Sequence, residues 1–369
     1  MNCKLIIIGN EILSGFTKDT NSFFLINELF KIGIQTSEVV CVKDNIQSIQ
    51  SQIDFQYNLI ILTGGLGPTS DDLTSESLFK YFKKEPNSLI KNSIGTAPGL
   101  SYIYNDTHII ALPGVPSELK NMIKEEVLPN LLKNQNRIPV NTFQVNIIGI
   151  PESRLIKLLD DFETNKDADI SMSYLPENVV VKLRFLSKST EAESQFQSIR
   201  LDLRKILGNS IFHFGNKSFE LFMNNLFLEK EVNASVAESC TGGYLSHLMT
   251  SFSGSSRFFK GGINAYSDVS KINILNLSKD LIKNKTAVCE EVAIDMAKSV
   301  RKIFNSDYGI ATTGYVGPGA PKGLMGVVWL ACISNKKTVT KMLKLKHDRK
   351  ANIIITSRLA LNLIREQII

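Results

Sequence analysis

The 369-residue chain has few of the residues that build disulfide frameworks or metal clusters. Its five cysteines, Cys3, Cys41, Cys240, Cys289 and Cys332, are odd in number, widely spaced and without a Cys-x-x-Cys pair. This pattern is typical of reduced thiols and predicts a cytoplasmic protein. The four histidines are equally isolated, so the sequence predicts no zinc site.

Long hydrophobic runs are also missing. The apolar stretch 5–8 ends at Gly9 and is too short for the core of a signal peptide, and no later run has the length of a membrane span. The net charge of +6 is modest, and the basic residues are interspersed with acidic ones. We therefore expect a protein without a dedicated nucleic-acid or membrane surface.

The length and the 43% hydrophobic content predict two or three domains with packed cores. Short apolar strands that end in glycine or proline turns predict an α/β domain over residues 1–145. Residues 146–212 read as a small α+β unit, and residues 213–369 alternate helix and strand again. The predicted fold class is α/β, with two three-layer α/β/α domains joined by a small α+β middle domain.

The expected elements within these segments are short. They are strands at 4–8, 58–63, 108–112, 179–185, 232–237, 308–313 and 327–332, and helices at 152–162, 191–207, 219–228, after 243, at 290–304 and at the C-terminus. The middle unit resembles a KH topology only loosely. Its only glycines are Gly149 and Gly208, so it lacks a Gly-x-x-Gly loop for a nucleic-acid backbone, which favours a spacer.

The most informative run is Glu238-Ser239-Cys240-Thr241-Gly242-Gly243, which lies between an apolar strand and an amphipathic helix. A helix start just past Ser239 leaves backbone N–H groups without partners at the positive end of the helix dipole. Thr241, Gly242 and Gly243 are therefore candidates to bind a phosphate or an oxyanion beside the Ser239 hydroxyl. An ordinary helix cap with a tight turn accounts for the same residues equally well.

Lys271 is the candidate base for this hydroxyl. Ser267 or Asp268 is expected to cap a helix with Lys271 in its first turn, where the helix dipole and partial burial would both lower the lysine pKa. The alternative is an ordinary surface lysine.

Two further segments have the composition of a ligand site. Thr313, Gly314 and Gly317 belong to the glycine loop 312–319, which follows the strand residues 308–311 and suits a close backbone approach to a ligand or an ordinary turn. Arg349 ends a basic stretch and is suited to a bidentate grip on phosphate. A solvated edge strand is compatible with the same charges.

Together these segments resemble the C-terminal nicotinamide-nucleotide amidase domain of the CinA family. The motifs are Glu238-Ser239-Cys240-Thr241-Gly242-Gly243, Gly254-Ser255-Ser256, Ala265-Tyr266-Ser267 with Lys271, Thr313-Gly314 with Gly317-Pro318, and Gly326-Val327-Val328-Trp329. The N-terminal segment is similar to the family's molybdopterin-binding-like domain. Its motifs are residues 8–15, Asp19-Thr20-Asn21, residues 63–69 with Asp71-Asp72, residues 95–99 and residues 111–118.

The resemblance implies hydrolysis of the carboxamide of nicotinamide mononucleotide to nicotinic acid mononucleotide and ammonia, a step of pyridine nucleotide salvage. In that reading Ser239 is the nucleophile, Lys271 with Tyr266 manages the proton, and the amides of Thr241, Gly242 and Gly243 hold the oxyanion. Thr313, Gly314 and Gly317 shape the pocket, and Arg349 anchors the 5′-phosphate. The step needs no cofactor, and a homodimer is expected.

The resemblance links the N-terminal domain to a metal-dependent ADP-ribose pyrophosphatase. The implied nucleotide-binding residues are Gly9, Glu11, Asn21, Gly64, Gly65, Gly67, Thr69, Gly114 and Ser117. Asp71 and Asp72 are the candidate Mg²⁺ ligands, although two acids in a first helical turn also simply complement the helix dipole.

The chain departs from the family pattern at two places. A polar segment expected between Phe82 and Gly95 is missing, so we expect a weak or absent pyrophosphatase. The loop 319–326 is shorter and altered, which bears on substrate affinity. Two alternatives remain open: a main activity in the N-terminal domain, or a non-catalytic nucleotide-binding protein associated with competence.

Overall fold

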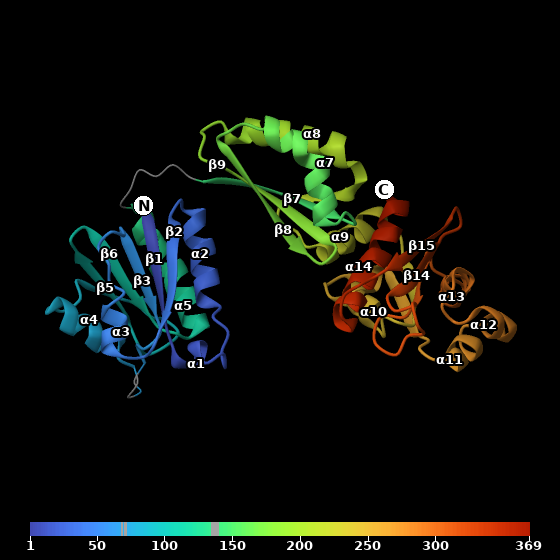
Figure 1. Cartoon of the computed structure of the whole chain (residues 1–369), viewed down its shortest axis with the longest axis horizontal. Helices are drawn as coiled ribbons and strands as arrows, with labels where there is room; N and C mark the ends of the chain where they lie inside the picture. The colour runs from blue at the N-terminus through green and yellow to red at the C-terminus, as the bar shows by residue number, and fades with distance from the viewer. Residues whose placement is uncertain (68, 70–71, 134–139) are drawn as a thin grey trace. The chain divides into compact units, whose positions relative to one another are not determined.

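The computed structural model describes residues 1–67, 69, 72–133 and 140–369 (Figure 1). The chain forms two compact units. One unit is Met1–Asn141 with Lys188–Thr190, and the other is Thr142–Ser187 with Glu191–Ile369. In the described residues no helix is both long and apolar enough to cross a membrane.

The N-terminal unit is built on a six-stranded sheet of order β2-β1-β3-β6-β5-β4. β2, β1, β3 and β6 pair in parallel, and β5 and β4 add antiparallel strands at one edge. Its elements are β1 (Asn2–Ile8), α1 (Asn10–Leu13), α2 (Asn21–Lys31), β2 (Gln35–Val42), α3 (Ile46–Gln50), β3 (Leu59–Thr63), α4 (Thr74–Phe82), β4 (Ser88–Ile90), β5 (Gly99–Tyr104), β6 (Thr107–Leu112), α5 (Pro116–Met122), a π-helical turn (Ile123–Val127) and α6 (Leu128–Lys133).

Alternation along β1 creates a hydrophobic core on each face of this sheet. Leu5 and Ile7 pack with residues of α2 and α5, whereas Ile6 and Ile8 pack with residues of α3 and α4. Successive side chains of a strand point to opposite faces, so a strand buried on both sides reads as a continuous apolar run. The predicted three-layer α/β/α arrangement is therefore confirmed for this unit.

The second unit begins with a small α+β part. Its sheet has the order β10-β7-β9-β8, and its elements are β7 (Asn141–Ile148), α7 (Glu152–Asn165), β8 (Ile170–Glu177), β9 (Val180–Ser187), α8 (Ala192–Leu207), a 3₁₀ turn (Gly208–Ser210) and β10 (Ile211–Phe214). The apolar face of α8, with Phe196, Ile199 and Leu203, packs with Leu155 and Leu159 of α7 in one core. These three- and four-residue spacings are those of one helix face.

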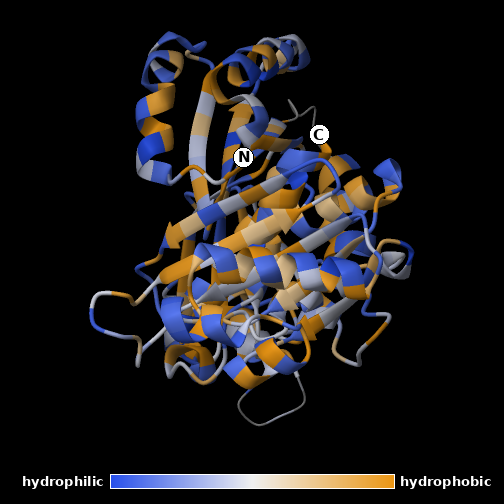
Figure 2. Ribbon diagram, turned by 90° about the vertical axis from the view of Figure 1, so that its right-hand side faces the viewer, coloured by the Kyte–Doolittle hydropathy of each residue, from blue (hydrophilic) through white to orange (hydrophobic). Residues whose placement is uncertain are grey.

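The C-terminal part is a second three-layer domain on a five-stranded sheet of order β12-β11-β13-β14-β15. Its elements are α9 (Phe219–Lys230), β11 (Ala234–Glu238), α10 (Tyr244–Thr250), a 3₁₀ turn (Ser255–Arg257), β12 (Phe259–Asn264), α11 (Asp268–Asn273), α12 (Lys279–Lys285), α13 (Glu290–Ile303), β13 (Tyr308–Gly314), β14 (Val327–Ile333), β15 (Thr338–Lys344) and α14 (Arg349–Ile368). One face packs on α9, α10 and α14, and the other on α13 and its neighbours. In Figure 2, hydrophobic and hydrophilic residues alternate along the helices that cover such sheets.

The middle and C-terminal parts are joined through α14. The half-buried Arg358 guanidinium lies 2.7 Å from a Glu220 oxygen of α9 and 3.1 Å from a Glu177 oxygen of β8. Arg365, which is 1% exposed, donates to the backbone carbonyl of Asn209. The same helix that ties the two parts together begins at Arg349, beside the candidate active site.

Candidate active site

A cavity of about 520 Å³ lies where three parallel strands of the C-terminal sheet end. β12, β11 and β13 run parallel, so their carboxyl ends meet at one edge. Ligand sites of open α/β sheets form at this edge because the loops after the strands converge there. The described lining residues are Ser239, Cys240, Tyr266, Asp268, Lys271, Ile282, Thr286, Ala287, Val288, Thr313, Gly314, Tyr315, Val316, Gly317, Pro318, Gly319, Ala320 and Arg349.

Ser239 is the first residue after β11 and is 7% exposed. Its backbone N–H donates to the carbonyl of Thr312 on the adjacent strand at 2.9 Å, which fixes the backbone at the point where the hydroxyl meets the cavity. A small hydroxyl on a rigid strand end is well placed to attack a bound carbonyl carbon.

Lys271 lies in the same cavity and is 2% exposed. Burial lowers the pKa of its ammonium below the ordinary value, and the nearby Asp268 carboxylate opposes that shift only partly. The predicted cap is confirmed, because Ser267 Oγ accepts from the N–H of Ser270. Lys271, however, lies in the last turn of α11 rather than the first, so burial and not the helix dipole depresses its pKa.

The lysine does not hydrogen-bond to the serine in the described part of the chain. Its Nζ donates to the carbonyl oxygen of Tyr266 at 3.1 Å and lies 3.7 Å from Asp268 Oδ1. Ser239 and Lys271 thus line one cavity, but the lysine amine is hydrogen-bonded to the Tyr266 carbonyl and not to the serine. Rotation about the flexible lysine stem would be needed to bring the amine to the hydroxyl.

The helix start after Ser239 differs from the prediction. α10 begins at Tyr244, and the N–H of Gly243 already donates to Glu238 Oε2 at 3.0 Å. The N–H of Gly242 turns back to the carbonyl of Ser239. These two amides are therefore engaged within the protein, and an oxyanion role for them does not fit the structure.

Thr241 also differs from the sequence reading. It is 2% exposed and is not among the described residues that line the cavity, and its hydroxyl lies 2.8 Å from the Thr312 hydroxyl. This contact links the bend formed by residues 239–243 to β13. In the described bend only the amides of Cys240 and Thr241 donate to no other residue, and Cys240 lines the cavity.

Cys240 itself is not a competing nucleophile. Burial of its thiol raises the pKa to about 12, although a hydrogen bond with Thr312 and the charge of Lys271 act in the opposite direction. The thiolate is the reactive form of cysteine, so this thiol stays protonated and inert at neutral pH. Of these two neighbours, Ser239 is therefore the better candidate nucleophile.

Arg349 is the first residue of α14, not part of an edge strand. Asp348 caps the helix by accepting from the N–H of Ala351 at 2.8 Å, and Arg349 Nη2 donates to the Tyr266 hydroxyl at 2.8 Å. Its aliphatic stem lies against Gly317, where a Cβ would come within 3.0 Å of it. Among the described lining residues Arg349 and Lys271 are the cations and Asp268 the carboxylate, which favours an anionic ligand.

The end of β13 and the glycine loop after it also line the cavity. Thr313, Gly314 and Gly317 all line the cavity, as predicted for a ligand loop. The Thr313 hydroxyl donates to the carbonyl of Ala287 at 2.7 Å, so it fixes the segment before α13.

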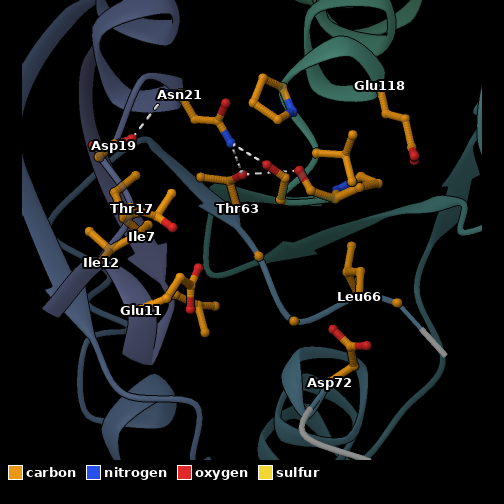
Figure 3. A pocket seen from close by; sticks show the side chains of 18 of the residues that line it. Ile7, Glu11, Ile12, Thr17, Asp19, Asn21, Thr63, Leu66, Asp72 and Glu118 are labelled. Carbon is orange, nitrogen blue, oxygen red and sulfur yellow. Dashed lines mark hydrogen bonds between the residues drawn. The ribbon is translucent and has the colours of Figure 1, made fainter. Parts of the chain in front are cut away.

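A second cavity, of about 450 Å³, lies at the strand ends of the N-terminal sheet (Figure 3). The predicted residues that line it are Glu11, Asn21, Gly64, Gly65, Gly67 and Gly114. Gly9, Thr69 and Ser117 are not among its described lining residues. Gly9 precedes α1, Thr69 binds Asp72, and Ser117 is exposed on α5.

Asn21 organises this second cavity. Its amide nitrogen donates to Thr63 Oγ1 at 3.1 Å and to the carbonyl of Gly114 at 2.8 Å, as Figure 3 shows. The next residue after Thr63 must be a glycine. Gly64 has a φ of +109°, and a Cβ at this position would lie 2.2 Å from the carbonyl oxygen of Ile8.

The predicted metal ligands receive no support from the described residues. Asp71 lies outside them. Asp72 accepts from the backbone N–H and the hydroxyl of Thr69; burial raises its pKa, but these hydrogen bonds outweigh that effect and the pKa is lowered. Within the described residues no three His, Cys, Asp or Glu side chains are grouped to hold an ion.

Comparison with known proteins gives three family matches in chain order. Residues 4–133 match the probable molybdopterin binding domain, residues 144–213 the damage-inducible protein CinA KH domain, and residues 216–368 the CinA C-terminal domain. A solved structure of a competence-damaged protein superfamily member from Enterobacter cloacae aligns with 27% identity over 42% of this chain and 95% of that one, with a TM-score of 0.40.

Full-length relatives match the whole chain. A CinA-like protein of Amoebophilus asiaticus is 32% identical over 100% of this chain and 99% of its own length. A putative competence-damage inducible protein of Clostridium botulinum is 31% identical over 100% of both chains. The first alignment extends over 415 positions, more than the 369 residues of this chain, so some of its positions have no counterpart in this chain. With all three domains and full-length relatives matched, the chain belongs to the CinA family.

Proposed function

We propose that the C-terminal cavity hydrolyses the carboxamide of nicotinamide mononucleotide and releases nicotinic acid mononucleotide and ammonia. The observation that supports this most strongly is the convergence of Ser239, Lys271 and Arg349 on one cavity. A nucleophile, a buried amine and a guanidinium are the groups that cleaving an amide on a phosphorylated substrate requires. The 520 Å³ volume lies within the range of small-molecule sites.

In the proposed reaction the neutral Lys271 amine takes the proton of the Ser239 hydroxyl as its oxygen attacks the amide carbon. The tetrahedral oxyanion accepts a hydrogen bond from the Cys240 amide. The lysine ammonium then protonates the leaving nitrogen, so ammonia departs and an ester remains on Ser239. Water, deprotonated by the same lysine, attacks the ester, and the lysine ammonium returns the proton to the departing Ser239 oxygen as the carboxylic acid product is released.

Tyr266 supports this chemistry through both its backbone carbonyl and its side-chain hydroxyl. Its carbonyl holds the Lys271 amine, and its hydroxyl accepts from Arg349. In the proposal the tyrosine therefore orients the base and the phosphate anchor and transfers no proton itself.

Arg349→Ala is expected to weaken the use of the phosphorylated substrate. Charge-assisted hydrogen bonds to phosphate contribute about 1.5–3 kcal/mol, so kcat/KM for the mononucleotide should fall about 10- to 100-fold, mainly through KM. Steady-state kinetics measure the change. Nicotinamide riboside, which lacks the phosphate, is the matched control substrate, and an equal loss with the riboside would contradict the phosphate role.

The full-length chain tests the proposal against its alternatives. Incubation with the mononucleotide should release ammonia and nicotinic acid mononucleotide in equal amounts. A parallel incubation with ADP-ribose and Mg²⁺ reports pyrophosphatase activity as AMP. AMP without ammonia would assign the activity to the N-terminal domain, and calorimetric binding of the mononucleotide without any turnover would favour a non-catalytic binding protein.

A further inference from the structure

A buried carboxylate lies directly beside the candidate nucleophile. Glu238 is the last residue of β11 and is 1% exposed, and Ser239 follows it in the chain. A buried ionised carboxylate is costly unless several donors satisfy it, so its partners indicate what it does.

All the groups that donate hydrogen bonds to the Glu238 carboxylate lie after Ser239 in the chain, at the start of α10. Glu238 Oε2 accepts from the N–H groups of Gly243 and Leu245, both at 3.0 Å. Glu238 Oε1 accepts from the N–H of Ser246 at 2.8 Å and from its hydroxyl at 2.6 Å. One side chain thus takes up the first amides of α10, which a helix leaves unpaired.

These contacts close a small ring of covalent and hydrogen bonds around the nucleophile. The chain leaves β11 at Glu238, passes through residues 239–243, and is tied back to Glu238 by the hydrogen bonds of α10. Gly242 and Gly243 lie in the bend with φ of +61° and +99°, a backbone region that glycine adopts without strain. The Glu238 side chain thus connects the strand end that precedes Ser239 to the start of the helix that follows it.

The other face of the bend is held separately. The Ser239 N–H donates to the Thr312 carbonyl, and the Thr241 and Thr312 hydroxyls lie 2.8 Å apart. Removing the Glu238 carboxylate would therefore release the bend from the start of α10, while its hydrogen bonds to Thr312 of β13 remain. The expected result is a folded protein with a misdirected nucleophile.

We propose that Glu238 is a positioning residue that sets the orientation of the Ser239 hydroxyl through the start of α10. It acts through the serine and the helix and is not placed against the substrate, because it is not among the described residues that line the cavity. This inference rests on the proposed function in one respect only, namely that the hydroxyl oxygen of Ser239 is the nucleophile. It extends that proposal by a residue outside the pocket.

Glu238→Gln is the test, because it keeps the shape of the side chain but replaces one acceptor with a donor that faces the helix amides. Misplacement of a reacting group by about 1 Å costs about a hundredfold in rate, so kcat for the mononucleotide should fall by about that factor while KM stays within about threefold. Ser246→Ala is the matched control. It removes one hydroxyl donor, leaves the three backbone donors in place, and should retain kcat within about threefold.

A second readout does not depend on the natural substrate. Phenylmethylsulfonyl fluoride sulfonylates activated serines, and the rate of Ser239 modification in the full-length protein is followed by peptide mass spectrometry. The rate should fall with Glu238→Gln by a factor similar to that of kcat and persist with Ser246→Ala. If the wild type is modified at Ser239 but releases no ammonia from the mononucleotide, the proposed function fails, and a slower modification of Glu238→Gln still supports the positioning role.

Folding is monitored by circular dichroism and thermal melting. If Glu238→Gln does not fold, Glu238→Asp serves instead, since it keeps the charge and withdraws the carboxylate from α10. A folded Glu238 variant with wild-type kcat and wild-type Ser239 modification would overturn the inference, as would a wild-type protein that is not modified at Ser239. A loss of stability with unchanged kcat would make Glu238 a structural cap only.

Discussion

Ser239→Ala is expected to abolish ammonia release from nicotinamide mononucleotide. Removing a serine nucleophile that acts with a base costs on the order of 10⁴- to 10⁶-fold in kcat, because the remaining groups cannot form the ester. The side chain lies at the end of β11 and lines the cavity, so the substitution removes one oxygen without disturbing a core. A coupled ammonia assay on the full-length variant measures the loss.

The neighbouring cysteine provides the control for this variant. Cys240 lines the same cavity, and burial holds its thiol protonated. Cys240→Ala should therefore keep turnover within about tenfold, the change expected from repacking rather than from lost chemistry. Ser239→Ala should still bind the mononucleotide in a calorimeter. Full turnover by Ser239→Ala, or its loss only with Cys240→Ala, would remove the serine from the mechanism.

Lys271→Met is expected to lower kcat by about 10² to 10⁴, the contribution typical of a positioned general base. Methionine has a similar length and fits the buried position, so folding and substrate binding should persist. Lys271→Arg keeps the positive charge but does not deprotonate, and it should be equally slow. An active Lys271→Arg enzyme would mean that the cation, not the base, matters at this position.

The pH dependence follows from the same residue. The base works when the lysine is neutral, so kcat/KM should rise with pH through the pKa of Lys271 and then level off. Burial lowers that pKa from the ordinary value of 10.5, so the rise should be centred below pH 10.5. The rise should disappear in Lys271→Met. A wild-type rate that is independent of pH across the alkaline range would contradict the assignment.

The apolar strands were the elements that sequence reasoning predicted best. The strands expected at 4–8 and 308–313 are β1 and β13, within two residues at each end, because the apolar residues at their centres are buried on both faces of their sheets. β2 and β8 are among the strands that were missed. The first half of β2 is polar, with the sequence Gln-Thr-Ser-Glu, and β8 has the sequence Ile-Ser-Met-Ser-Tyr-Leu-Pro-Glu, so neither has an apolar signal over its whole length.

The site was predictable to the extent that strand ends converge. Ser239, Lys271, Gly314 and Arg349 come together because each follows or faces the carboxyl edge of the C-terminal sheet. The partners of individual amides were not predictable, since the sequence does not say which carboxylate meets a helix start. The role of Glu238 as acceptor for the first amides of α10 was therefore missed. The sequence signal that could have indicated it is an acidic residue a few positions before a helix start.

The most direct test of the account is to find the acyl group itself. The full-length protein is mixed with nicotinamide mononucleotide, quenched in acid over a series of times, digested and analysed by mass spectrometry. The account predicts an ester of the nucleotide acid on Ser239, formed together with a burst of ammonia and absent in Ser239→Ala. An acyl group on Cys240, or steady ammonia release with an unmodified Ser239 at every quench time, would contradict it.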